Sequence, residues 1–577
     1  VRRDRNHPSV IVWSFGNESG AASDFSTAKS EMQQYDTTRP YFYCNEDNLV
    51  SYSDLHSNMY PTVSGVLSKS SGYNGKPYFI CEYAHAMGQA VGNLKEYWDV
   101  IEGSTGIIGG CIWDWVDQAI CKPADLVNGI KMKNGFNNWV AGYDYNSTNG
   151  INQGFQGNFL DNGLITPDRK WTSKLTEVKK VYQNVAFKGF SGKTLTIKNK
   201  NAFTNLNAYN LVWRVLQDGR LVEEDQVNIP SISAGSTGTV DIPYTVVTTD
   251  GAEYMLDVEL CLKENTLWAE RGYEVAKEQF ALAARSTEST MSVHQTTGGS
   301  LSVSGNTVSG ITDEGKKFSM TFNNGNLTAW TFDGQSLMSA GPAFNSYRDI
   351  DNDRNCSLAF SLAYPSSGTL SKSGNNAVLT ASSRGASCNY TITYTIYPDA
   401  TVDMKVTFNP NGATRRIGLG MQFAGGMEQV EYYGRGPWSN YVDRKTGSYL
   451  GRYLTTVDDM LEEQIHPQTF GDHQDLRELA LTNPSNGLSL NIKTAGQVAF
   501  SLSHYDETKY CGTDDTMWSD GTHWYDLTKQ SQTYAHFDYY QRGLGNNSCG
   551  GDQALTQYQC PTSGTYSYTL RLSPSKK

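Results

Sequence analysis

The sequence predicts a multidomain protein in which part of a (β/α)₈ barrel is followed by an immunoglobulin-like β-sandwich and a large antiparallel β-sandwich. The 577 residues are too many for a single hydrophobic core. The first 185 or so alternate short apolar runs with helix-like stretches, which is typical of a parallel α/β region. Beyond them, apolar residues recur at every second position between turn residues, as they do in antiparallel sheets.

Five apolar runs mark the expected strands of the first region: residues 10–15, 41–44, 58–60, 78–81 and 110–113. The first run is almost continuously apolar, so we expect both of its faces to be covered. Helices are expected at residues 25–35, 93–102 and 171–182, and in the second of these Leu94, Tyr97 and Ile101 share one face. Five strand-helix units indicate part of a barrel, because a closed one needs eight.

We therefore divide the chain into three parts. Residues 1–185 form the barrel portion, residues 186–285 the immunoglobulin-like sandwich, and residues 286–577 the large sandwich. The segment ARSTEST, residues 284–290, is the expected linker between the two sandwiches.

Composition excludes several classes of partner. The formal net charge is −12, so the surface would repel a phosphate backbone and nucleic acid is not expected. No apolar stretch approaches the roughly 18 residues that span a bilayer, and no signal segment opens the chain. We expect a soluble protein without a membrane partner, and leave open whether it is secreted, periplasmic or cytoplasmic.

The ten cysteines do not decide the compartment. Cys81 and Cys111 lie in apolar strand-like runs, where free buried thiols are common, and no zinc-ligand spacing surrounds Cys81. Two later pairs are disulfide candidates that sequence alone cannot decide: Cys356 with Cys388, and Cys549 with Cys560.

The chain begins with Val1, and its first core strand is expected within ten residues. A barrel of five strands cannot close, since an open parallel sheet leaves backbone groups unpaired. The expectation is a carboxyl-terminal portion of a longer polypeptide, or one half of a complementing pair, inactive by itself. The strand at residues 10–15 would then expose one edge.

Two glutamates end two different predicted strands. Glu18 follows the first strand in WSFGNES, and Glu82 ends another in YFICEYAHAMG, with His85 one short turn later. Active sites of barrels sit at the carboxyl ends of the strands. A pair of carboxyls there suits glycoside hydrolysis, in which one protonates the leaving oxygen while the other, ionised, attacks the anomeric carbon.

Aromatic residues end two further strands. Trp113 and Trp115, in GGCIWDWVDQ, offer faces that can stack on a sugar ring, and Tyr60, in NMYP, can donate its hydroxyl to a neighbouring carboxylate. Each feature alone is more often structural than functional. Their combination at strand ends favours a carbohydrate-active site.

These stretches carry a family resemblance. The motifs NHPSVIVWSFGNESG, ICEYAHAMG, WDWVDQ and NGLITPDR resemble the active-site motifs of glycoside hydrolase family 2, specifically the large bacterial β-galactosidases of the lactose-operon type. TLWAERGYEVAKEQF resembles the end of that family's second immunoglobulin-like domain, and YYGRGPWSNYVDRKTGSYLG its carboxyl-terminal sandwich. The resemblance covers essentially the whole chain. It also implies amino-terminal domains and first barrel strands that this chain lacks.

The resemblance implies roles for individual residues. Glu18 would be the acid/base and Glu82 the nucleophile that forms a covalent galactosyl intermediate. Four others would contact sugar or nucleophile: Asn17 the 2-hydroxyl, Tyr60 the Glu82 carboxylate, His85 the galactose hydroxyls, and Trp113 an apolar wall. Near the carboxyl end, Tyr534 would stand where the family has a tryptophan on the aglycone side.

The resemblance also implies metal ions and no organic cofactor. Magnesium would be bound by Glu18, with its remaining ligands in the family's missing part. Sodium would be held near the galactose 6-hydroxyl by the Phe159 carbonyl and the Asn162 side chain, so that Asn162 also borders the substrate.

The predicted function is that of a retaining exo-β-galactosidase acting on terminal β-galactosides. One alternative is a relative acting on β-mannosides or β-glucuronides, and another is a non-catalytic carbohydrate-binding fragment. Homo-oligomer formation and the natural galactoside are left open.

Overall fold

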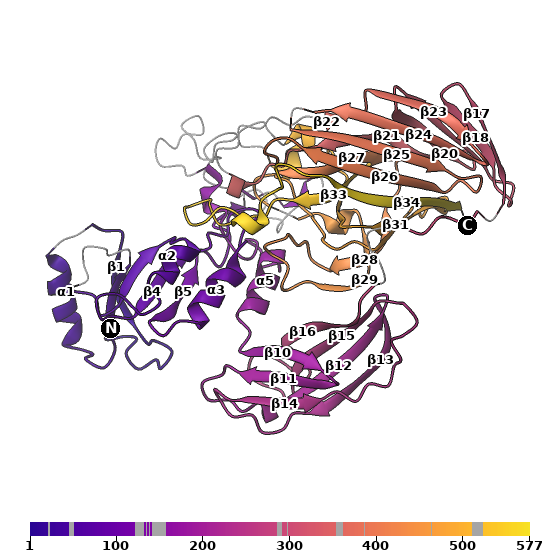
Figure 1. The fold of residues 1–577 in the computed structure, drawn as a ribbon. Helices are drawn as coiled ribbons and strands as arrows, with labels where there is room; N and C mark the ends of the chain where they lie inside the picture. The colour runs from indigo at the N-terminus through magenta and orange to yellow at the C-terminus, as the bar shows by residue number, and fades with distance from the viewer. Residues whose placement is uncertain are drawn as a thin grey trace.

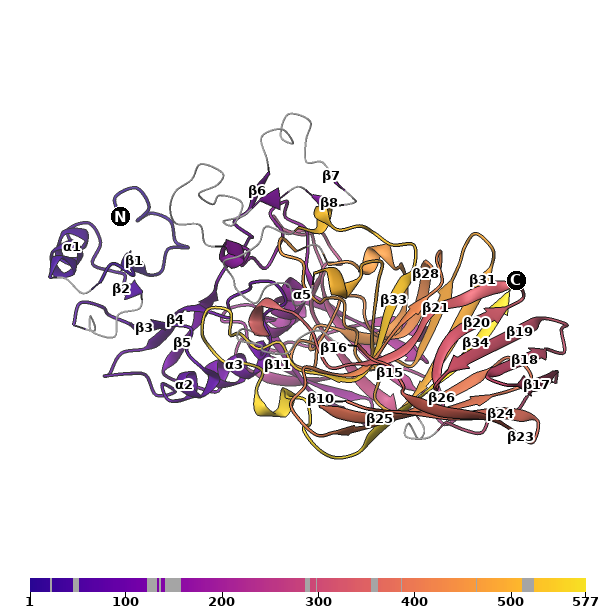
Figure 2. The ribbon, with the colours of Figure 1, turned by 90° about the horizontal axis from the view of Figure 1, so that it is seen from above.

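The computed structural model describes residues 1–20, 23–44, 51–121, 132–133, 136–137, 139–140, 157–285, 291–296, 298–353, 362–385, 387–462, 464–510 and 523–576. An α/β region lies at one end of the molecule, with the N-terminus in it, and a large sandwich lies at the other, with the C-terminus (Figures 1 and 2). A smaller sandwich lies beside both (Figure 1). Residues 286–290 of the expected linker, which was placed at 284–290, fall outside the described residues.

The α/β region contains all five predicted strands and all three predicted helices, with ends shifted by a few residues. Its main elements are β1 (Trp13–Asn17), α1 (Asp24–Gln33), β2 (Tyr41–Cys44), β3 (His56–Met59), α2 (Val63–Leu67), β4 (Tyr78–Tyr83), α3 (Leu94–Glu102), β5 (Ile107–Ile112) and α5 (Ser173–Val181). Short elements follow β5: β6 (Ile120–Cys121), β7 (Met132–Lys133), β8 (Phe136–Asn137), β9 (Trp139–Val140) and the 3₁₀ turn η3 (Gly157–Leu160).

The main strands β1 to β5 pair in parallel, whereas the short strands β6 with β9 and β7 with β8 pair antiparallel. β1 pairs with β2, and β3, β4 and β5 form a three-stranded sheet in that order. A parallel bridge between Val116 and Ile165 continues the chain direction beyond β5. The carboxyl ends of these strands therefore point the same way, as a shared site at that edge requires.

The expectation of a fully covered strand at residues 10–15 is wrong in part. β1 begins only at Trp13, and the Ile11 side chain is 73% exposed. Among the described strands β1 pairs with β2 alone, so one of its edges has no strand beside it. Apolar residues ahead of Trp13 therefore have no sheet to pack into.

Helix α3 follows the predicted pattern. Leu94, Tyr97 and Ile101 are buried against the core formed by Tyr78 and other strand residues. None of the described helices is long and apolar enough to cross a bilayer.

The small sandwich consists of seven antiparallel strands in two sheets. One sheet has the order β10 (Val185–Ser191), β11 (Thr194–Asn199), β14 (Thr237–Asp241), and the other β13 (Arg220–Asn228), β12 (Tyr209–Gln217), β15 (Tyr254–Leu262), β16 (Glu274–Ala283). The period-two pattern has a direct structural cause: in β12, Leu211, Trp213 and Val215 are buried between the sheets, while the residues between them are less buried.

The large sandwich consists of two nine-stranded antiparallel sheets that enclose one continuous core. The first comprises β17 (Ser300–Ser304), β18 (Thr307–Ile311), β19 (Lys317–Asn323), β20 (Asn326–Phe332), β21 (Gln335–Asn345), β22 (Leu362–Ala363), β27 (Arg416–Phe423), β33 (Thr533–Gln541) and β32 (Ala499–Ser503). The second comprises β23 (Ser367–Ser373), β24 (Asn376–Arg384), β25 (Cys388–Ile396), β26 (Val402–Pro410), β34 (Tyr566–Lys576), β31 (Leu488–Ala495), β30 (Glu478–Thr482), β28 (Gln429–Gly436) and β29 (Tyr449–Thr456).

The two sandwiches pack against each other through β15. All nine of its residues are buried, although only alternate ones face its own core. On the other face, Met255 packs against Tyr433 and Leu450 of the large sandwich. The nearby Glu253 carboxylate accepts hydrogen bonds from Arg477 at 3.2 Å, so the junction combines apolar burial with an ion pair.

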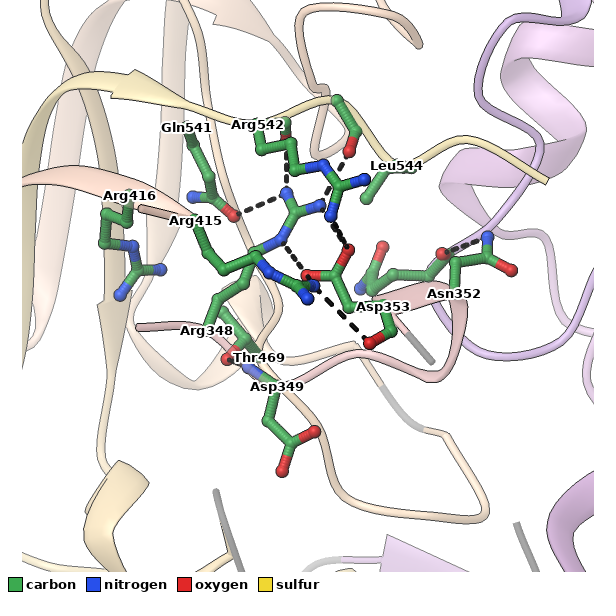
Figure 3. Close-up of polar contacts among 12 residues, drawn as sticks. Arg348, Asp349, Asn352, Asp353, Arg415, Arg416, Thr469, Gln541, Arg542 and Leu544 are labelled. Atoms are coloured by element: carbon green, nitrogen blue, oxygen red, sulfur yellow. Dashed lines mark hydrogen bonds and ion pairs between the residues drawn. The ribbon is translucent and has the colours of Figure 1, made fainter. Parts of the chain in front are cut away.

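A buried ionic cluster organises the edge of the large sandwich that faces the α/β region. The Asp353 carboxylate lies 2.8 Å from the Arg348 guanidinium, 2.6 Å from that of Arg415 and 3.3 Å from that of Arg542 (Figure 3). Burial opposes ionisation of Asp353, but the charges of Arg348 and Arg415 outweigh it and hold its pKa below the usual range. Arg348 also donates to the carbonyls of Arg542 and Gly543, which ties the end of β33 to the cluster.

Asp353→Ala should strongly destabilise the large sandwich, because three guanidinium groups would lose their shared counter-charge in a buried site. The expected loss is about 3–5 kcal/mol in the free energy of unfolding of the sandwich transition, measured in urea. Asp99→Ala is the matched control, since it removes an exposed ion pair with Lys95 and should cost about 1 kcal/mol or less. Equal losses in the two variants would contradict the anchoring role of Asp353.

Candidate functional site

Glu82 lies near the carboxyl end of β4 and is half-buried. The Tyr60 hydroxyl donates to its Oε2 at 2.8 Å, and the Tyr60 backbone N–H donates to the Glu82 carbonyl at 2.7 Å. Tyr60 follows β3 directly and has a positive φ of 46°, which turns the chain at the strand end. Parallel pairing of β3 with β4 therefore sets the tyrosine beside the carboxylate.

The electrostatic surroundings of Glu82 favour its protonated form. Burial raises the pKa of the carboxyl, the hydrogen bond from Tyr60 lowers it, and the negative charges of Glu18 and Asp114 raise it further. The influence of Glu18 matters most for the site, because it indicates that the two strand-end glutamates lie within electrostatic reach of each other.

Glu18 directly follows β1, which ends at Asn17. Its backbone has a positive φ of 49°, so the chain turns sharply at this residue, and both side chains are exposed. Tyr43 stabilises this turn, because its hydroxyl accepts a hydrogen bond from the Ser19 backbone N–H at 2.5 Å. The turn that carries Glu18, the predicted acid/base, is thus supported by a residue of β2.

His85 is fully buried, close to Glu82, and contacts three side chains from distant parts of the sequence. Its Nδ1 lies 2.9 Å from the Ser548 Oγ, its Nε2 lies 3.5 Å from the Asn162 Nδ2, and its ring stacks on Phe159 with centroids 4.8 Å apart. The Tyr60 ring meets it edge-on at 5.9 Å. The structure thus brings together Tyr60, His85, Phe159 and Asn162.

Trp113 is half-buried and lies just beyond β5. Its N–H donates to the Tyr83 carbonyl at 3.1 Å, and its carbonyl accepts from Ala86 at 2.7 Å, so its backbone is fixed between the residues that flank His85. Trp115 is 56% exposed.

The large sandwich contributes residues that were not predicted for the site. Ser548 contacts His85, and Cys549 lies against the Tyr60 hydroxyl, whose pKa is raised first by burial and then by the charge of Cys549 and the hydrogen bond to Glu82. Tyr534, which the resemblance placed on the aglycone side, lies within β33, paired with Gln422 and Ser503 of the same sandwich. The sequence offered one signal for Ser548 and Cys549. Both lie in the glycine-rich stretch GLGNNSCGG, and glycine-rich loops permit close approach of the backbone.

Several cysteine expectations are wrong. Cys81 is bonded to Cys44, with Cα atoms 5.8 Å apart, because the ends of β2 and β4 lie close together. Cys111 is a free thiol but exposed, since it sits on the open face of β5. Cys549 and Cys560 are not bonded to each other, and Cys560 is buried. Cys388 is also a free, buried thiol, and Cys356 lies outside the described residues.

Two metal sites can be compared with the residues present. The Asn162 Oδ1 is a buried oxygen without a hydrogen-bond partner among the described residues, and the Phe159 carbonyl accepts a 3.2 Å bond from the Asn162 Nδ2. Both oxygens suit a hard cation such as sodium. At Glu18 an exposed carboxylate suits magnesium as one ligand.

A third acidic group lies in the large sandwich, where Glu428, Asp458 and His504 bring ligand atoms within 4.8 Å of one another. His504 already pairs with Glu428 at 2.5 Å, and Asp458 with Lys529 at 2.5 Å. Internal ion pairs therefore account for this group without a metal.

A cavity of about 640 Å³ lies between the α/β region and the large sandwich, away from the two glutamates. Its lining includes Glu462, which accepts hydrogen bonds from Gln89, Ser173 and Ser439, one of them at 2.6 Å. At this cavity, polar groups of the α/β region and of the large sandwich hydrogen-bond one another. We therefore assign the cavity to the interface between these two parts.

Three models of known families match successive parts of the chain. The model of glycosyl hydrolases family 2, TIM barrel domain, matches residues 1–187, that of β-galactosidase domain 4 matches residues 195–283, and that of the β-galactosidase small chain matches residues 314–572. The chain belongs to glycosyl hydrolase family 2. Family membership agrees with the placement of two glutamates at ends of parallel strands.

Curated relatives match the chain from end to end. A β-galactosidase of Priestia megaterium is 30% identical over 99% of this chain and 55% of its own length. β-Galactosidases of Photobacterium profundum and Streptococcus thermophilus are 28% and 29% identical, over 100% and 99% of this chain and 57% of their own lengths. The chain thus spans little more than half the length of these relatives.

Proposed function

We propose that this chain carries the catalytic glutamates of a retaining exo-β-galactosidase. The observation that carries the proposal is Glu82, held by Tyr60 at a strand end and sensitive to the charge of Glu18. The β-galactosidase relatives supply the substrate class. The proposal includes the assignment of residues 1–185 to a partial barrel and of residues 186–285 to an immunoglobulin-like sandwich.

The proposed reaction has two steps. In the first, Glu18 gives its proton to the glycosidic oxygen as the bond from that oxygen to the anomeric carbon breaks, and the ionised Glu82 forms a new bond to the carbon. In the second, Glu18 takes a proton from water, the water oxygen attacks the anomeric carbon, and galactose leaves as the bond to Glu82 breaks. Retention requires the two carboxyls about 5–5.5 Å apart.

The remaining residues would bind the sugar. Asn17 would hydrogen-bond the 2-hydroxyl beside the reacting carbon, and His85 and Asn162 would contact hydroxyls on the buried side. Trp113 would offer an apolar face to the ring. Tyr60 keeps the Glu82 carboxylate aimed and favours its ionised form.

Two cations fit the residues present. Glu18 would hold magnesium, and the Phe159 carbonyl with the Asn162 Oδ1 would hold sodium. When bound, these cations supply positive charge beside the acid/base and beside a sugar hydroxyl. No ligand for magnesium besides Glu18 is assigned in this chain.

Substitution of the two glutamates should separate their roles. In the native polypeptide that carries this chain, Glu82→Gln should abolish turnover of every β-galactoside, because no covalent intermediate can form. Glu18→Gln should retain a burst with a dinitrophenyl galactoside, whose leaving group needs no proton. Stopped-flow release of dinitrophenol measures both.

Glu31→Gln, on the exposed surface of α1, is the control and should behave as wild type. If the burst disappears equally in both active-site variants, the assignment of acid and nucleophile is wrong. Rates on nitrophenyl mannoside and glucuronide test the alternative substrates, and absence of turnover on all three glycosides would favour a non-catalytic binding fragment.

Tyr60→Phe should move the acid limb of the kcat/KM profile to higher pH. The hydroxyl lowers the pKa of Glu82, so its loss raises that pKa, and Glu82 is then protonated at pH values where the wild type is ionised. Loss of a hydrogen bond to a charged group corresponds to a shift of about 1–2 pH units. Tyr73→Phe, whose ring packs on His56 with centroids 4.0 Å apart, is the control. An unchanged acid limb in Tyr60→Phe would count against the ionised nucleophile.

A further inference from the structure

One loop of the large sandwich reaches into the α/β region and holds His85. The Ser548 hydroxyl lies 2.9 Å from the His85 Nδ1 and donates to the His85 carbonyl at 3.3 Å. Ser548 is fully buried, and 463 residues separate it from His85 in the sequence. A residue from another part of the fold thus contacts both the ring and the backbone of a proposed sugar-binding histidine.

These contacts select one tautomer of His85. The Asn162 Nδ2 donates to the Phe159 carbonyl at 3.2 Å. The same Nδ2 faces the His85 Nε2 at 3.5 Å, so Nε2 is the acceptor nitrogen. Nδ1 therefore carries the proton and donates to Ser548, whose own proton goes to the His85 carbonyl.

Asn352 in turn fixes Ser548. Its Oδ1 accepts a hydrogen bond from the Ser548 backbone at 3.0 Å, and its Nδ2 donates to the carbonyls of Gln89 at 3.0 Å and Gly545 at 3.1 Å. The side chain is 2% exposed. One amide therefore connects the Ser548 loop to the segment that follows His85.

The position of Asn352 is set by the ionic cluster beside it. Asp353, the next residue, is held by Arg348 and Arg542, and Figure 3 places Asn352 at the edge of this cluster. Arg348 binds the carbonyls of Arg542 and Gly543, at the start of the Ser548 loop. The ionic cluster around Asp353 thus fixes both residues of this contact: Asn352, which precedes Asp353, and Ser548, whose loop begins at the carbonyls that Arg348 binds.

We propose that Asn352 is a positioning residue for galactoside binding, which acts through Ser548 to hold the His85 ring beside Asn162. This inference rests on the proposed function. It gives the large sandwich a defined part in substrate binding, because the loop that carries Ser548 fixes the imidazole whose Nε2 faces the Asn162 amide.

A double-mutant cycle tests the proposal in the native polypeptide. Asn352→Ala and Ser548→Ala should each raise KM for nitrophenyl galactoside by about tenfold, with a smaller change in kcat, because a substrate hydrogen bond loses its alignment. The double variant should be no worse than the single ones, since both act on the same contact. Effects that multiply would show that Asn352 does not act through Ser548.

The control is Asn483→Ala, a buried asparagine of the large sandwich whose Oδ1 accepts from Ser485 at 2.9 Å. It should lower the melting temperature without changing KM. If Asn352→Ala likewise lowers only the melting temperature, Asn352 is merely structural and the proposal is overturned.

Alkylation of Cys549, followed by peptide mass spectrometry, gives a readout that needs no activity. Asn352→Ala should increase the labelling rate several-fold because the loop loses its anchor, whereas Ser548→Ala should not, since its backbone N–H still reaches Asn352. Buried Cys560 is the internal reference. If the wild type hydrolyses no galactoside, the proposed function fails, and unchanged Cys549 labelling in Asn352→Ala would then refute the positioning role separately.

Discussion

The Asp353 carboxylate, shared by three guanidinium groups in the buried edge of the large sandwich, is the interaction on which the candidate site depends. A buried carboxylate is tolerated only when charges and hydrogen bonds compensate its lost hydration, and Arg348, Arg415 and Arg542 supply that compensation. Because Arg348 also binds two backbone carbonyls at the end of β33, the cluster fixes the direction in which the chain leaves the sandwich. That direction carries Ser548 and Cys549 to the ends of the barrel strands.

The site is therefore composite. Parallel strands supply Glu18, Glu82 and Tyr60, and the large sandwich closes one side of the group around His85. Further contacts reinforce this junction: Arg444 donates to the Ala90 carbonyl at 3.1 Å, and the Asp443 carbonyl accepts from the Asn93 backbone N–H at 3.2 Å. Loops on a rigid scaffold commonly carry binding residues, and here the scaffold spans two domains.

The two glutamates lie in different surroundings, which suits two opposite tasks. Glu82 is half-buried and hydrogen-bonded by a tyrosine, whereas Glu18 is exposed at a sharp turn. The negative charge of Glu18 raises the pKa of Glu82, whereas the hydrogen bond from the Tyr60 hydroxyl lowers it.

Local sequence patterns were sufficient for the elements and for the residues at strand ends. The strands holding Glu82 and Trp113, the face of α3 with Leu94 and Tyr97, and the alternation in β12 all follow from the spacing of apolar residues, which each element imposes on its own few residues. Tertiary structure alone decided what meets those strand ends. The exposed Ile11, the bond between Cys44 and Cys81, and the contacts of Ser548 with His85 and of Asn352 with Ser548 join segments whose proximity depends on how whole domains pack. No periodicity records such contacts, because periodicity reports only which side of an element is buried and not which distant residue covers it.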